Sequence, residues 1–110
     1  MKTSIALAAL AFTGLAVTVA QAQGLPQGPS ISRGQAFART NCASCHAIGR
    51  TGESPLRQAP PFRTLHRHYP VEDIAESLAE GIVTAHPGMP QFQLEMGEIG
   101  DLIAYLKTLE

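Results

Sequence analysis

The chain has 110 residues, of which 45% are hydrophobic and 15% are charged, and its formal net charge at pH 7 is −1. This length allows one small domain with little core to spare, and we find no internal repeat and no sign of a second domain. The near-neutral charge argues against the strongly basic proteins that bind nucleic acid.

The first 22 residues have the composition of a secretory signal peptide. Lys2 is the only charge before an apolar run over residues 5–20, and Ala20-Gln21-Ala22 supplies the small-x-small pattern of a cleavage site. The alternative is an uncleaved membrane anchor, but the run is short for a bilayer core of ~30 Å and is diluted by polar residues. We therefore expect cleavage near Ala22, no membrane anchor after processing, and a flexible N-terminal arm over residues 23–30.

Charge is divided unevenly along the rest of the chain. Residues 23–70 contain six arginines and one acid, Glu53, whereas residues 71–110 contain eight acids and one cation, Lys107. Ordinary solvated helix faces would give this pattern, and so would an electrostatic dipole that orients a charged partner.

The first predicted helix leads into a pair of cysteines. Residues 32–35, Ser-Arg-Gly-Gln, fit the S-x-x-Q capping box, in which both side chains bind free backbone N–H groups at a helix start. We expect this helix to run from about Arg33 to Asn41. Glycines and prolines interrupt residues 47–61 and predict a loop. Pro61 suits the first position of a short helix near residues 62–66.

Two further helices are predicted in the second half. In residues 71–81, Ile74 and Leu78 are four apart, acids lie at the start, and Gly81 provides a stop. Residues 86–92 contain two prolines and a glycine and predict irregular structure. The last helix carries one apolar stripe at helical spacing, formed by Ile99, Leu102, Ile103, Leu106 and Leu109. Because no segment alternates with a strand's period of two, the fold class is all-α.

Both cysteines of the chain lie in one short motif, Cys42-Ala43-Ser44-Cys45-His46. A thioredoxin-like redox pair would need a neighbouring βαβ pattern, and a structural zinc site would need four ligands placed around one small ion. Cys-x-x-Cys-His is instead the signature of covalent attachment of a c-type haem. On one helical turn, positions i, i+3 and i+4 share a face, so two thioether bonds and an iron-binding imidazole can serve one porphyrin.

With this motif, the chain resembles the class I cytochromes c, small soluble proteins with one haem, over residues 31–109. The likeness consists of Gly34 eight residues before Cys42, the CASCH motif, an Ala59-Pro60 step, Gly-Met-Pro at residues 88–90 and the closing amphipathic helix. It implies an all-α cytochrome c domain over residues 31–110, with three to four helices around one covalently bound haem c and its iron.

The resemblance also implies the axial ligands of the iron. His46 would be the proximal ligand and Met89 the distal one, on a strap stiffened by Pro87 and Pro90. Methionine raises the reduction potential of such a haem. The rival distal candidates are Met96, His86, His66 and His68. A proline carbonyl would accept the other ring N–H of His46, and this is Pro60 or, because the proline is doubled, Pro61.

The family crosses its first and last helices closely, which would place Gly34 and Gly100 at the crossing with Leu102 and Tyr105 packed over Gly34. Relatives often carry an aromatic residue where this chain has Ala38, with Phe37 one place earlier. The side chains expected to line the haem pocket are Phe62, Leu65, Ile74, Leu78 and Phe92.

With His46 and Met89 both bound, no iron position is open to substrate, so we expect one-electron transfer and no enzymatic activity. The expected protein is a periplasmic monomer with a redox donor and a redox acceptor as partners. The alternatives are an electron-transfer subunit of a larger dehydrogenase or oxidase, and a five-coordinate haem enzyme or gas binder.

Overall fold

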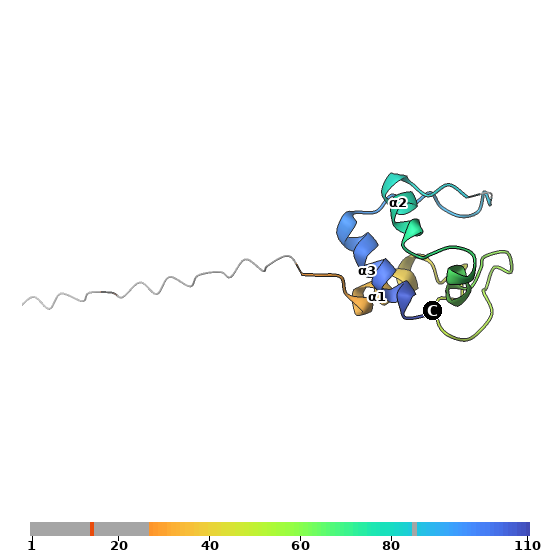
Figure 1. The fold of residues 1–110 in the computed structure, drawn as a ribbon, viewed down its shortest axis with the longest axis horizontal. Coiled ribbons are helices and arrows are strands. Elements are labelled where there is room, and N and C mark those ends of the chain that lie inside the picture. Colours follow the sequence, from red (N-terminus) through yellow and green to blue (C-terminus); the bar gives the residue numbers. More distant parts are fainter. Residues whose placement is uncertain (1–13, 15–26, 85) are drawn as a thin grey trace, which may run out of the picture.

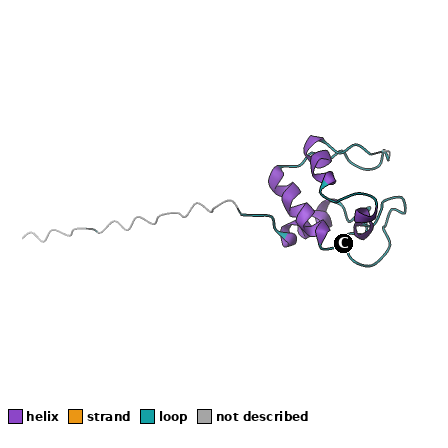
Figure 2. Ribbon diagram, in the orientation of Figure 1, coloured by secondary structure: helices purple, strands orange, loops and turns teal. Residues whose placement is uncertain are grey.

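The computed structural model describes residue 14 and residues 27–84 and 86–110. The predicted signal peptide, except for Gly14, and the first part of the predicted arm lie outside the described residues. In the described part there are three α-helices and one 3-10 helix and no β-strand (Figures 1 and 2). The prediction of an all-α fold is confirmed. None of these helices combines the length and the apolar character needed to cross a bilayer.

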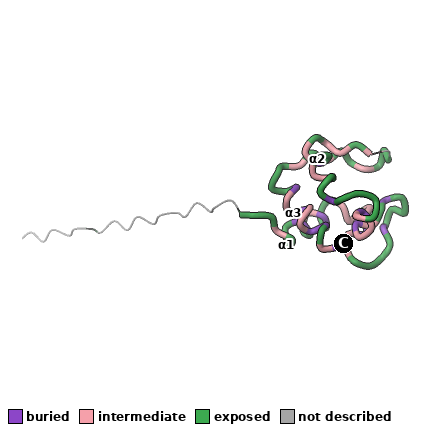
Figure 3. The backbone as a smooth tube through the Cα atoms, in the orientation of Figure 1, coloured by how far each residue is buried: buried purple, intermediate pink, exposed green. Residues whose placement is uncertain are grey.

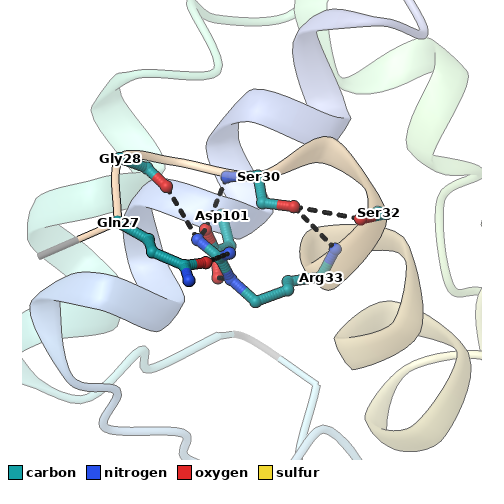
Figure 4. Close-up of polar contacts among 6 residues, drawn as sticks. All are labelled: Gln27, Gly28, Ser30, Ser32, Arg33 and Asp101. Carbon is teal, nitrogen blue, oxygen red and sulfur yellow. Dashed lines mark hydrogen bonds and ion pairs between the residues drawn. The ribbon is translucent and has the colours of Figure 1, made fainter. Parts of the chain in front are cut away.

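Helix α1 spans Ile31–Asn41 and begins two residues earlier than predicted. Its N-cap is Ser30, whose hydroxyl accepts a hydrogen bond from the Arg33 N–H, so the predicted capping box at residues 32–35 is wrong (Figure 4). The Ser30 N–H is held by a carboxylate oxygen of Asp101 at 2.6 Å. This contact, made 71 residues away in the sequence, fixes the helix start at Ser30.

The middle of the chain follows the predictions. After the loop, a 3-10 helix, η1, spans Phe62–Arg67, with Pro61 just before it. Helix α2 spans Asp73–Glu80 and ends at Gly81, whose φ of 98° lies in the left-handed region that favours glycine.

Helix α3 spans Met96–Lys107 and begins with a reciprocal cap. The Glu95 side chain accepts from the backbone N–H of Glu98, and the Glu98 carboxylate accepts from the Glu95 N–H at 3.1 Å. These two glutamates therefore cap the helix directly, and their negative charges also interact favourably with the positive end of the helix dipole.

Helices α1 and α3 cross in close contact at Gly34 (Figure 1). A Cβ on Gly34 would lie 2.0 Å from the Asp101 carbonyl oxygen and 2.9 Å from the Tyr105 Cβ, distances that no real side chain tolerates. The prediction for Gly34 and Tyr105 is confirmed, and the backbone of Asp101 lies nearest to Gly34. Gly100 does not lie at the crossing, since a Cβ there would meet Pro29 at 3.4 Å.

The core lies between the inner faces of α1, α2, α3 and η1 (Figure 3). Leu106 and Val71 are its largest fully buried side chains. Tyr105 is also buried, and its hydroxyl donates to the Ile48 carbonyl oxygen at 2.7 Å. This bond attaches α3 to the loop that follows the cysteine motif.

Candidate functional site

The cysteine motif forms a tight turn directly after α1. Helix α1 ends at Asn41, and the Cys42 carbonyl oxygen accepts from the N–H of Cys45 at 3.1 Å and from that of His46 at 2.9 Å. Both cysteines are free thiols, and all three side chains line one cavity. These two bonds have the i+3 and i+4 spacing of helical hydrogen bonds, although α1 has already ended at Asn41.

The ring of His46 has a fixed orientation. Its Nδ1 lies 2.8 Å from the Pro60 carbonyl oxygen, while the Pro61 carbonyl accepts from the N–H and hydroxyl of Thr64. Because a carbonyl oxygen can only accept, Nδ1 carries the proton and Nε2 has the free lone pair. Phe62 packs beside the ring, with centroids 5.1 Å apart. A histidine held this way has the arrangement usual for a metal ligand.

The cavity has a volume of about 440 Å³ and mostly apolar walls. The five side chains predicted to line it all do so, namely Phe62, Leu65, Ile74, Leu78 and Phe92. Phe37 also lines it, whereas Ala38 is fully buried in the helix contact. No sequence signal pointed to Leu56 and Tyr69, which line the cavity and yet are 41% and 43% exposed. They therefore stand at its mouth.

Met89 reaches the cavity from a strap between α2 and α3. The Met89 N–H donates to the His86 carbonyl oxygen at 3.1 Å, which closes a turn with Pro87 and Gly88 at its corners. The Thr84 hydroxyl lies 3.1 Å from the same carbonyl oxygen and 3.2 Å from the His86 nitrogen. In the described part of the chain, a Cβ on Gly88 would meet no atom within 4 Å apart from its two chain neighbours. The strap thus holds the Met89 side chain, which is half-buried, against the cavity.

The other candidate distal ligands lie in three different places. His86 lines the same cavity as Met89. His66 and His68 line a separate surface cleft beside Lys107. Met96 is 74% exposed at the start of α3. The structure therefore brings Met89 and His86 to the site and leaves Met96, His66 and His68 outside it.

Burial affects the chemistry of the first thiol. Removal from water, with a smaller contribution from the neighbouring Cys45, raises the pKa of Cys42 to about 11. Cys42 is therefore a neutral thiol at physiological pH.

The donor set suits a haem. One cavity offers two thiols that are three residues apart, an oriented imidazole nitrogen, a thioether sulfur on a separate strap and mostly apolar walls. Two thiols bind the porphyrin edge in c-type attachment, and histidine with methionine is an axial pair of cytochromes c.

Comparison with known proteins shows the family of this chain. A profile of the family described as cytochrome c matches residues 31–110. The chain is 30% identical over 95 residues to cytochrome c-552 of Bradyrhizobium diazoefficiens, an alignment that covers 86% of this chain and 89% of that protein. It is 34% identical over 77 residues to a cytochrome c-553-like protein of Synechocystis, covering 70% of this chain and 67% of that one. The chain belongs to the cytochrome c family of haem-containing electron-transfer proteins.

Proposed function

We propose that the protein is a periplasmic carrier of single electrons with one haem c, attached through Cys42 and Cys45 and ligated by His46 and Met89. The observation that carries this proposal is that all four side chains line the same apolar cavity. They come from two separate segments, the turn after α1 and the strap before α3, which the fold brings to one site.

Each segment has its own task. Bound haem supplies the one-electron chemistry. The Pro60 carbonyl orients His46 and raises its basicity as a ligand, while the turn at Pro87 and Gly88 presents the Met89 sulfur. A sulfur ligand favours the reduced iron and so raises the reduction potential. With two axial ligands from the protein, no iron position remains for a substrate, so we propose a carrier and not an enzyme.

The partners of such a carrier are a redox donor and a redox acceptor. The exposed side chains of Leu56 and Tyr69 at the cavity mouth suit a short-lived contact with either partner by a monomeric protein. Export with cleavage near Ala22, an N-terminal arm over residues 23–30 and a haem domain over residues 31–110 complete the proposal.

Acid-acetone extraction and optical spectroscopy test the haem and its ligands. We expect the haem to stay with the protein in acid-acetone, because two thioether bonds hold it. The oxidised wild type should show the weak near-infrared band of a sulfur-iron bond, and Met89→Ala should lose it. Met96→Ala is the matched control and should keep the band, since Met96 lies outside the cavity.

Two results would contradict the proposal. Release of all the haem by acid-acetone would exclude covalent attachment. Rapid binding of carbon monoxide by the reduced wild type would indicate an open iron position and so a gas-binding or enzymatic haem.

A further inference from the structure

The strap before α3 presents two iron-binding side chains to the cavity. His86 and Met89 both line it, and they are the first and fourth residues of the same hydrogen-bonded turn. In a β-turn these two residues have Cα atoms within about 7 Å of each other. The turn therefore keeps a histidine and a methionine close together along the strap, and both residues line the cavity.

The ring of His86 forms no hydrogen bond that is found in the described part of the chain. The hydrogen bonds found for His86 in the described part of the chain use its backbone N–H and carbonyl, and none uses its ring. Its side chain is exposed, whereas Met89 is half-buried. In the structure Met89 thus occupies the deeper position, with the His86 ring nearer to solvent.

Hydrogen bonds to Phe92 and Leu78 hold the base of the strap, whereas those found around His86 and Met89 in the described residues are local. At the base, the Ile82 N–H donates to the Phe92 carbonyl at 2.9 Å, and the Leu94 N–H donates to the Leu78 carbonyl at 2.8 Å. Around His86 and Met89, the hydrogen bonds found in the described residues are local, one within the turn and two between the Thr84 hydroxyl and the His86 backbone. Among the described residues other than its two chain neighbours, no atom lies within 4 Å of a Cβ built on Gly88. Among the described residues, the bonds that a rearrangement around His86 and Met89 would break are therefore these local ones.

From this geometry we infer that His86 is a second distal ligand, which binds the haem iron when the Met89 sulfur does not. This inference rests on the proposed function. The exchange replaces one neutral donor with another, so the site stays six-coordinate and closed to small ligands. Because methionine raises the potential of a His-ligated haem, the His86-bound form has the lower reduction potential.

The test compares three purified holoproteins at one pH: Met89→Ala, Met89→Ala/His86→Ala and, as the matched control, Met89→Ala/His68→Ala. His68 is an exposed histidine outside the cavity. We expect Met89→Ala and the His68 control to be low-spin and six-coordinate without the sulfur-iron band. The His86 double variant should be high-spin and its reduced form should bind carbon monoxide at least about tenfold faster, a factor equivalent to about 1.4 kcal/mol.

The outcomes separate this inference from the proposed function. Covalent haem with a high-spin iron already in Met89→Ala overturns the inference alone, as does a His86 double variant that matches the His68 control. A chain without covalent haem overturns the proposed function and the inference with it. Met89→Leu keeps the side-chain volume and gives the same comparison if the alanine variants do not fold.

Discussion

Arg33 and Asp101 form a two-pronged ion pair between α1 and α3, with Nε 2.6 Å from Oδ2 and Nη2 2.8 Å from Oδ1 (Figure 4). The same guanidinium donates to the Gly28 carbonyl oxygen at 2.7 Å, and the same carboxylate accepts from the Ser30 N–H at 2.6 Å. One pair thus holds the helix crossing and the chain that enters α1. The described part of the predicted flexible arm, residues 27–30, is attached to the domain by these bonds.

The first prediction concerns the effect of low pH on the stability that this ion pair contributes. Hydrogen bonds from Arg33 and from the Ser30 N–H hold the pKa of Asp101 below its ordinary value, although burial opposes them. The folded protein therefore binds this proton less readily than the unfolded chain. The pair's contribution to stability is complete above the ordinary aspartate pKa of roughly 4 and is lost as the pH falls through the lower folded pKa.

Asp101→Asn should therefore lower the urea midpoint of the holoprotein at pH 7. As the pH is lowered, the midpoint of this variant should fall by less than that of the wild type. Unfolding curves between neutral pH and the acid limit measure both effects. Glu76→Gln is the control, because Glu76 is exposed on α2 and forms no ion pair in the described residues. An unchanged acid dependence in Asp101→Asn would show that other carboxylates govern acid unfolding.

The second prediction concerns the close approach of the two helices. Gly34→Ala should destabilise the protein by on the order of 1–3 kcal/mol, because the new methyl group would overlap the Asp101 backbone, which cannot rotate away. Gly97→Ala, on α3 with no atom within 4 Å of the new Cβ, should leave stability unchanged or raise it by up to about 1 kcal/mol. Urea unfolding measures both variants, and equal midpoints would contradict the steric explanation.

The sequence predicted most of this site because its signals are local. The Cys42–His46 motif has a fixed spacing, and the stripe of Ile99, Leu102 and Leu106 repeats at the helical period, so each can be read without knowing the rest of the fold. The helix positions and the all-α class follow from such signals, whereas the cavity-lining side chains are expected from the resemblance to the cytochromes c.

What the sequence could not predict depends on distant contacts. The start of α1 is set by a carboxylate on α3, 71 residues away, which the local pattern at residues 32–35 could not indicate. The contact of Gly100 with Pro29, and not with α1, depends on the path of the entering chain. Whether Pro60 or Pro61 faces His46 likewise depends on the geometry of the loop, which puts the Pro60 carbonyl beside His46.

The third prediction concerns the bond between Tyr105 and the loop after the cysteine motif. Tyr105→Phe removes the donor to the Ile48 carbonyl oxygen and should cost about 1 kcal/mol of unfolding free energy. Tyr69→Phe is the matched control, since Tyr69 is 43% exposed and no hydrogen bond of its hydroxyl is found in the described residues. Similar urea midpoints for the two variants would mean that water replaces the lost donor at no cost.

The last prediction concerns removal of the haem. An apolar cavity destabilises a protein by about 24 cal/mol per Å³, so a cavity of about 440 Å³ left without its cofactor corresponds to roughly 10 kcal/mol. Water that enters at the cavity mouth lowers this cost, so the value is an upper figure. It is nevertheless as large as the whole unfolding free energy of a typical domain, about 5–15 kcal/mol. The double variant Cys42→Ala/Cys45→Ala, purified free of haem, should therefore lose most of its helical circular dichroism and its cooperative unfolding. Cys42→Ala alone keeps one attachment point and serves as the control. A haem-free chain that unfolds cooperatively with native helix content would mean that α1 and α3 form a stable core without the cofactor.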